Sequence, residues 1–262
     1  MTERVQKILS RHGGSLPATA EQMIEAGRVR INGEPAFLGQ KADPIRDIIE
    51  VDQQLINPEQ RPGPCYLLLH KPLGMVSTCF DPEGRPTVLK ALPEPLHQVG
   101  IHPVGRLDAY STGALLLTND GDLTYRLTHP KHNVVKTYRV EIEGAITSEA
   151  LGAWQNGVLL DGQLTRPAQV RVLKFGRGNS TWLQVELREG RNRQIRRVAE
   201  ALGHRVLSLH RTAVGSIQLG NLKSGSYRSL SSAEIKALLA ELEIPAAILK
   251  KPVNSSVSVS RF

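Results

Sequence analysis

The segment GRLDAYSTGALLLTNDG, from Gly105 to Gly121, joins a polar loop to a dense apolar run. The run Ala114–Leu117 predicts a buried strand, and the Asn-Asp-Gly that follows predicts the turn that ends it. One acid, Asp108, stands in the loop ahead of this strand, two residues after Arg106. Loops that enter rigid strands often hold reactive side chains, although an isolated loop aspartate is more often a turn or cap residue. The rest of the chain must decide between these interpretations.

The composition indicates a globular protein with a polyanionic partner. The chain has 262 residues, 40% of them hydrophobic, which suffices for one or two domains with a real core. Its formal charge of +8 and pI of about 9.7 favour a partner such as nucleic acid. Aromatic residues make up only 4%, which argues against a surface tiled with stacking rings.

The sequence also indicates a cytoplasmic protein. Cys65 and Cys79 form no CxxC pair and are too few for a disulfide framework, as is usual in a reducing compartment. The N-terminal stretch MTERVQKILSRHGG is charged throughout, and no run approaches the ~20 apolar residues of a membrane span. We therefore expect neither a secretory signal nor a membrane partner. An organelle stroma is the alternative location, if a transit peptide has been removed.

Residues 1–58 predict a small unit of two helices followed by a hairpin. ERVQKILSRHG places three apolar residues on one helical face: Val5, Ile8 and Leu9. TAEQMIEAG offers Thr19 as the N-cap and Gly27 as the C-terminal stop of a second helix. The alternation in RVRI predicts a strand, Asn32-Gly33 is a typical hairpin turn, and DIIEVD supplies another strand.

The order of these elements, with IEAGRVRING at its centre, resembles the RNA-binding domain named after ribosomal small-subunit protein S4. That domain usually carries a Ser-Arg-Arg step at the start of its second helix, whereas this chain has GGSLPATAEQ. The arginines that would grip phosphate are therefore missing. The alternative is a helix–hairpin spacer that binds no RNA. Residues 59–65, in a proline-rich stretch, predict a linker after this unit.

Residues 66–245 predict a second, strand-dominated domain. Tyr66–Leu69 suits a buried strand, and KTYRVEIEG, QVRVLKF and TWLQVELREG alternate as half-buried antiparallel strands do. SSAEIKALLAELEI predicts a late helix capped by Ser231 or Ser232, and residues 246–262 predict a flexible tail. The fold class is thus α+β: a small helix–helix–hairpin domain, then a mainly antiparallel twisted sheet flanked by helices.

The segment LREGRNRQIRRVAEALGHRV predicts an amphipathic helix with arginines at its start. Apolar residues at helical spacing form its buried stripe: Ile195, Val198, Ala199 and Leu202. At about 100° per residue, Arg193 and Arg197 point away from the stripe, whereas Arg196 lies on its flank. A flanking arginine can reach a partly buried carboxylate, while the outward pair suits phosphates together with Arg188 and Arg191. A solvated basic face is the alternative for the outward pair.

Taken together, four segments resemble the RsuA/RluB family of ribosomal RNA pseudouridine synthases. They are HKPLGMVST, GRLD with STGALLLTNDGDLTYRLTHP, KTYRV, and REGRNRQIRRVAEALGHRVLSLHRTAVG. They stand in the family's order, and with the S4-like unit the resemblance covers nearly the whole chain. Two small departures, His70 for the usual asparagine and Ala114 for leucine, do not touch the chemistry.

The resemblance implies a mixed α/β core around a twisted sheet, with a cleft that takes the RNA. It assigns Asp108 as the catalytic aspartate, Tyr138 as the residue that contacts the target base, and Arg196 as the basic partner of the aspartate. Leu209 falls where the family packs an apolar residue against the site. The cation would keep Asp108 ionised, and the tyrosine could stack on the extruded uracil or help remove the C5 proton. Taken alone, Tyr138 would more simply be a strand aromatic in the core.

Pseudouridine formation needs no redox step or group donor, so the resemblance implies neither cofactor nor metal. Consistently, the chain has no Gly-rich phosphate loop and no clustered His/Cys ligand set. Asp108 could attack the sugar, attack the base or remove a ribose proton. Basic residues of the motifs are candidates to hold phosphates around the target: Lys71, Arg106, Arg191, Arg193 and Arg211. Arg106 could instead occupy the gap left by the flipped base.

The sequence thus predicts a monomeric isomerase that acts on ribosomal RNA or a pre-ribosomal particle. The late segment RTAVGSIQLGNLKSGSYRSL favours the branch that modifies large-subunit 23S RNA, with small-subunit 16S RNA as the alternative. A non-catalytic RNA-binding assembly factor is another alternative, which the joint presence of Asp108, Tyr138 and Arg196 opposes. An RNA hydrolase would want a second acid or a metal beside Asp108. Glu189 is the nearest acid in the motifs, but no ligand spacing supports that role.

Overall fold

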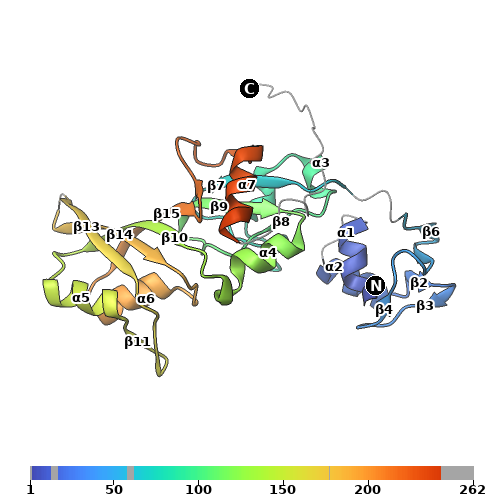
Figure 1. Ribbon diagram of the computed structural model, residues 1–262, viewed down its shortest axis with the longest axis horizontal. Helices are drawn as coiled ribbons and strands as arrows, with labels where there is room; N and C mark the ends of the chain where they lie inside the picture. The colour runs from blue at the N-terminus through green and yellow to red at the C-terminus, as the bar shows by residue number, and fades with distance from the viewer. Residues whose placement is uncertain (1, 13–16, 58–61, 177, 243–262) are drawn as a thin grey trace.

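The computed structural model describes residues 2–12, 17–57, 62–176 and 178–242 (Figure 1). They form a small N-terminal domain and a larger domain built on a nine-stranded sheet. The expected tail at 246–262 and part of the expected linker lie outside the described residues. No helix in the described part of the chain is long and apolar enough to cross a membrane.

The N-terminal domain contains two helices and two small sheets. Helix α1 (Val5–His12) packs on α2 (Pro17–Glu25), which begins two residues before Thr19, the expected cap. The sheets have the order β3–β2–β5–β6 and β1–β4, and their strands are β1 (Glu3–Arg4), β2 (Val29–Ile31), β3 (Glu34–Pro35), β4 (Lys41–Ala42), β5 (Ile49–Val51) and β6 (Gln54–Leu55). Positive φ angles of 53° at Asn32 and 87° at Gly33 form the expected tight hairpin turn.

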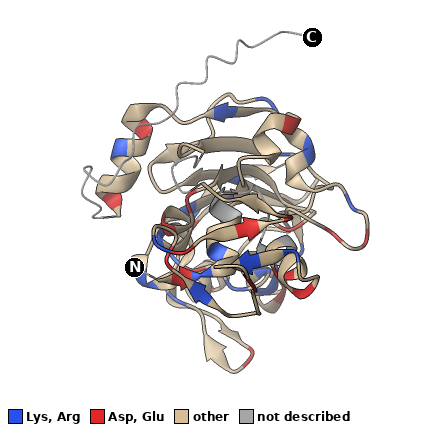
Figure 2. Ribbon diagram, turned by 90° about the vertical axis from the view of Figure 1, so that its right-hand side faces the viewer, with Lys and Arg blue, Asp and Glu red and all other residues tan. Residues whose placement is uncertain are grey.

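The apolar face expected for α1 forms the centre of this domain. Val5, Ile8 and Leu9 are each at most 1% exposed. The domain does not carry the positive charge of the chain, because residues 1–58 contain seven Lys and Arg against eight Asp and Glu. Figure 2 shows both signs interspersed along its ribbon. The other 26 Lys and Arg lie beyond residue 58, so attraction for a polyanion comes mainly from the larger domain.

The larger domain is built on a sheet with the order β13–β14–β10–β15–β9–β7–β17, with β16 beside β15 and β8 beside β9. Its strands are β7 (Tyr66–Lys71), β8 (His102–Pro103), β9 (Thr112–Thr118), β10 (Lys136–Glu143), β13 (Gln169–Gly176), β14 (Ser180–Leu187), β15 (Val206–Val214), β16 (Ile217–Gln218) and β17 (Tyr227–Ser229). A separate hairpin pairs β11 (Leu159–Leu160) with β12 (Gln163–Leu164). The expected mainly antiparallel sheet is confirmed, since only β9 and β15 pair in parallel within it.

The parallel contact between β9 and β15 joins two halves of this sheet. It is short, with His210 opposite Thr112 and Arg211 opposite Gly113. Gly113 has a φ of +109°, and a Cβ at this position would lie 2.2 Å from the carbonyl oxygen of Arg211. Glycine meets both the backbone angle and the close approach of the two strands. The joint places the loop that precedes β9 beside the middle of β15.

Helices cover the sheet and complete three apolar cores (Figure 1). Helices α4 (Gly121–Thr128) and α7 (Ser232–Glu241) share one core with Leu68 and Leu116 of β7 and β9. Alternate residues of the same strands, Leu69 and Leu115, join a core with η1 (Val88–Ala91), next to α3 (Glu94–His97). Helices α5 (Ser148–Asn156) and α6 (Gln194–Ala201) pack on β10, β14 and β15. The predicted late helix is α7, and Ser231 is its cap.

Candidate active site

Asp108 lies in the loop that enters β9, at the joint between the two halves of the sheet. Its Oδ2 accepts a hydrogen bond from Nε of Arg196 at 3.2 Å. The Arg196 and Asp108 side chains are 16% and 25% exposed, so the ion pair is shielded yet reachable. Oδ1 of Asp108 is buried and has no hydrogen-bond partner among the described residues. Arg196 thus holds one carboxylate oxygen, while the other is shielded from water and left without a partner in this part of the chain.

Arg196 reaches the carboxylate from the first turn of α6. The helix buries Ile195 at 5% exposure, which sets the next residue on the flank of the apolar stripe, as expected from the sequence. Nη2 of Arg196 also donates to the carbonyl of Tyr110 at 2.9 Å and to Oγ of Ser111 at 3.4 Å. The guanidinium therefore binds both the carboxylate and the backbone behind it, which fixes the direction of the acid.

The HKPLGMVST segment holds the backbone of the loop around the carboxylate. Oγ of Ser77 donates to the carbonyl of Leu107 at 2.9 Å and accepts from its N–H at 3.1 Å. The N–H of Gly74 donates to the carbonyl of Ala109 at 2.8 Å. Ser77 is 8% exposed, so its two bonds are shielded from water. The residues on both sides of the acid are thus fixed by one segment.

Lys71 belongs to the same segment and is completely buried, at 0% exposure. Its Nζ donates to the carbonyls of Ser111 at 2.7 Å and Pro72 at 3.0 Å. Burial lowers the pKa of its ammonium to about 8, with the charge of Asp108 opposing this shift and that of Arg211 reinforcing it. The expectation that Lys71 holds phosphate is wrong, because the side chain does not reach the surface. Lys71 instead fixes the passage from the loop into β9.

Arg211 and Tyr138 lie opposite each other on β15 and β10. Cζ of Arg211 is 6.0 Å from the ring centre of Tyr138, whose ring packs against the cores of both halves. Nε of Arg211 donates to the carbonyl of Ala114 at 2.6 Å, whereas its Nη2 is buried and unpartnered within the described ranges. Because Arg211 is only 4% exposed, its predicted role as a surface phosphate contact is also wrong. Arg211 is thus part of the framework at the joint between β9 and β15.

The other predicted site residues do not gather around Asp108. Arg106 and Arg193 are exposed and remain candidates for contacts with phosphate. Arg191 is tied to the β11–β12 hairpin, where it donates to two backbone carbonyls at 3.1 and 2.6 Å. Leu209 is 7% exposed and packs in the core beneath α5 and α6. These residues therefore divide into exposed cations and parts of the framework.

Glu189, the nearest acid in the motifs, has a structural role. It is 9% exposed, and its Oε1 accepts from the backbone N–H of Arg166 at 2.9 Å and from Nε2 of Gln194 at 2.7 Å. Nε of Arg191 lies 3.5 Å from its Oε2. Both oxygens are engaged, which argues against a hydrolase with Glu189 as the second acid. The described residues also contain no group of three or more His, Cys, Asp or Glu that could hold a metal.

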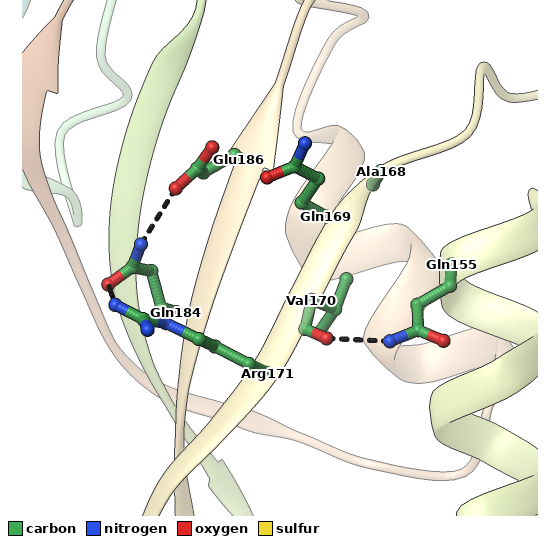
Figure 3. A pocket seen from close by; sticks show the side chains of 7 residues that line it. All are labelled: Gln155, Ala168, Gln169, Val170, Arg171, Gln184 and Glu186. Atoms are coloured by element: carbon green, nitrogen blue, oxygen red, sulfur yellow. Dashed lines mark hydrogen bonds between the residues drawn. The ribbon is translucent and has the colours of Figure 1, made fainter.

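Two surface cavities lie on the half of the domain that contains α6. One has a volume of about 500 Å³ and is lined by Asp161, Asn192, Arg193, Arg196, Arg197 and Glu200. The other, of about 480 Å³, lies over β13 and β14 and includes none of the site residues (Figure 3). Polar side chains around the second cavity bond to one another, with Arg171 donating to Gln184 at 2.8 Å. The first cavity includes Arg196 in its lining but not Asp108.

The sequence interpretation assigned no role to Ser77, Gly74 or Gly113, which position the loop. The first two lie within the HKPLGMVST motif and the third within STGALLL. Small residues inside an apolar motif were the available signal, because such positions often mark close backbone approach. Their partners are distant in sequence, so the signal alone could not identify them.

Comparison with known proteins identifies the family. The sequence model for RNA pseudouridylate synthase matches residues 65–201, and the model for the S4 domain matches residues 3–43. The chain belongs to the RNA pseudouridylate synthase family. The expected order, an S4 domain followed by a pseudouridine synthase domain, is confirmed.

Curated relatives extend the match over nearly the whole chain. The ribosomal large subunit pseudouridine synthase B of Bacillus subtilis is 37% identical, over 91% of this chain and 96% of that protein. The protein of the same name from Escherichia coli K12 is 38% identical, over 94% and 85%. A crystal structure described as that of pseudouridylate synthase aligns with a TM-score of 0.65 at 32% identity, covering 90% of this chain and 99% of that one. The synthase fold thus accounts for nearly the whole molecule.

Proposed function

We propose that this protein converts a uridine of large-subunit ribosomal RNA to pseudouridine, with Asp108 as the essential carboxylate. The geometry at this residue carries the proposal: one oxygen is bound to Arg196 and the other is unpartnered within the described ranges, in a chain of this family. The relatives named for the large ribosomal subunit support that RNA over the small-subunit RNA.

The reaction breaks the bond between N1 of uracil and C1′ of ribose, turns the base, and joins C5 to C1′. C5 loses a proton to solvent and N1 gains one, so the product has the atoms of the substrate and consumes no electron or group donor. Asp108 can form a transient bond to the sugar or to the base, or accept a ribose proton. All three routes use a carboxylate oxygen of Asp108.

The neighbouring residues suit this task. Arg196 binds the carboxylate in a shielded site, where electrostatic interactions are strong, and the charge of Asp108 acts on the nearby Lys71. The ring of Tyr138 offers a contact for the flipped base. A uridine in an RNA loop leaves its stack at lower cost than one in a duplex, which favours a loop as the target.

The experiment is tritium release from ribosomal RNA labelled at C5 of uridine, with the RNA of each subunit supplied separately. We expect the wild-type protein to release tritium from large-subunit RNA and not from small-subunit RNA. Release from small-subunit RNA alone would overturn the substrate assignment. Binding without release from either RNA or from precursor particles would favour the assembly-factor alternative.

A further inference from the structure

Exposed aromatic and basic side chains cluster where α4 ends, and the proposed reaction does not use them. Tyr125 is 49% exposed, and its ring centre lies 4.9 Å from that of His129 and 5.9 Å from that of His132. Nζ of Lys131 stands 5.0 Å from the centre of the same ring. We call these four residues the Tyr125 patch. An exposed ring beside cations is a combination that binds nucleic-acid bases and phosphates.

The patch is positively charged, and its backbone is well supported. Between Asp122 and Glu141 the chain has four Lys or Arg and two His, and neither Asp nor Glu. The turn that presents the patch is η2 (Pro130–His132). Arg166 and Arg188 donate to backbone carbonyls of this turn at 3.3 and 3.1 Å. A surface that is already ordered loses less entropy when it binds, and its charge complements a polyanion.

The patch adjoins the loop that carries Asp108. Helix α4 follows β9 and returns along it, and Cγ2 of its last residue, Thr128, lies 3.5 Å from the position of a Cβ on Gly105. Gly105 opens the loop three residues before Asp108, and the next residue, Arg106, is exposed. The loop that contacts the end of α4 at Gly105 is therefore the same short loop that carries the candidate catalytic carboxylate.

We propose that the Tyr125 patch binds the RNA strand next to the target uridine. One base of that strand stacks on the ring of Tyr125, and the exposed Lys131 and His129 contact its phosphate. Every base has a face that can stack, so the patch contributes affinity and orientation more than base choice. This inference rests on the proposed function, because the site at Asp108 is what brings RNA to the patch.

The test compares Tyr125→Ala with Tyr125→Phe, using an in vitro transcript of large-subunit ribosomal RNA for both turnover and equilibrium binding. Loss of the stacked base should raise KM and Kd about five- to tenfold, with kcat nearly unchanged. The Phe variant keeps the ring and should behave like the wild type. Lys131→Ala should weaken binding about three- to fivefold. It should also lower by about one the number of ions released on binding, which the salt dependence of Kd measures.

Matched controls lie on β13, at the other end of the catalytic domain (Figure 1). Phe175 is an aromatic residue that is 69% exposed, and Nζ of Lys174 stands 5.8 Å from the ring centre of Trp182. Phe175→Ala and Lys174→Ala should leave KM and Kd unchanged.

Three outcomes would overturn the proposal. Tyr125→Ala could keep wild-type KM and Kd on the naked transcript, the controls could raise them equally, or the change could occur only with ribosomal particles. The last outcome would assign the patch to a ribosomal protein. Because binding is measured beside turnover, a wild type that binds without turning over refutes the proposed function and still tests the patch.

Discussion

The two halves of the catalytic sheet contribute different things to Asp108. The half that contains β7 fixes the position of the loop, since Ser77 and Gly74 bind its backbone through uncharged groups. The half that contains β15 and α6 supplies the guanidinium that binds the carboxylate, through Arg196. The bonds to the two residues beside Asp108 and the ion pair with its carboxylate therefore come from separate segments. Substitutions can therefore remove one contribution and leave the other.

The largest effect is expected from loss of charge. Arg196→Ala should lower kcat about 10²- to 10³-fold, because a preorganised electrostatic contact to the reacting group is lost. Arg196→Lys keeps the charge without the planar fork and should recover part of the rate. Arg193→Ala is the control, since Arg193 is exposed at the same helix start and should affect KM alone. Wild-type turnover by Arg196→Ala, with a native circular dichroism spectrum, would refute its role.

The joint between the halves can be broken at Gly113. A methyl group there would meet backbone atoms of Arg211 at 2.2 to 2.9 Å, on a residue with a φ of +109°. Gly113→Ala should therefore lower the free energy of unfolding by about 3 kcal/mol or more. Urea unfolding would measure this.

The control for that variant is Gly152→Ala in α5, where a Cβ meets nothing within 4 Å. Alanine there should stabilise the protein by up to about 1 kcal/mol, because it is the better helix former. Equal stability of Gly113→Ala and the wild type would show that the joint does not require glycine.

Displacing the loop that carries Asp108 should lower kcat less than removing the charge of Arg196. Ser77→Ala removes both bonds to Leu107 and should lower kcat about tenfold, with KM and the pH profile unchanged, because the loop shifts while the charges remain. Thr78→Ala is the control, since the hydroxyl of Thr78 bonds locally, to the carbonyl and the N–H of Phe80. A lower free energy of unfolding with no change in kcat would show that Ser77 stabilises the fold and does not position the loop for turnover.

The smallest effect concerns Lys71, whose pKa falls from an ordinary 10.5 to about 8 in the folded protein. Between these values the unfolded chain binds more protons, so the unfolding free energy should rise with pH, by at most about 1.4 kcal/mol per unit for this residue. Lys136, with a pKa also lowered to about 8 by burial, adds a similar rise. Urea unfolding from pH 8 to 10 should show a shallower rise for Lys71→Met than for the wild type. An identical slope would contradict the assignment.

Much of the site could be predicted because it follows from local periodicity. The apolar stripe of α6 placed Arg196 on its flank, and the structure brings that side chain within 3.2 Å of Asp108. The strands and the hairpin at Asn32-Gly33 follow from alternation and turn preferences in the same way. Sequence patterns predict the features that depend on residues close together in the sequence.

The roles of Lys71 and Arg211 could not be predicted in this way. Both were expected to contact phosphate as basic residues of the motifs. Their burial depends on carbonyl groups that the distant strand β9 and its entry loop present. The parallel joint at Gly113 depends equally on a partner strand far along the chain. Tertiary packing, which residue patterns do not encode directly, decides these positions.

The most direct test of the central claim is tritium release by Asp108→Asn from large-subunit ribosomal RNA labelled at C5 of uridine. The substitution preserves the shape of the side chain and removes its charge. We predict no release, with a native circular dichroism spectrum and RNA binding retained. Release at the wild-type rate would show that Asp108 is not the essential carboxylate.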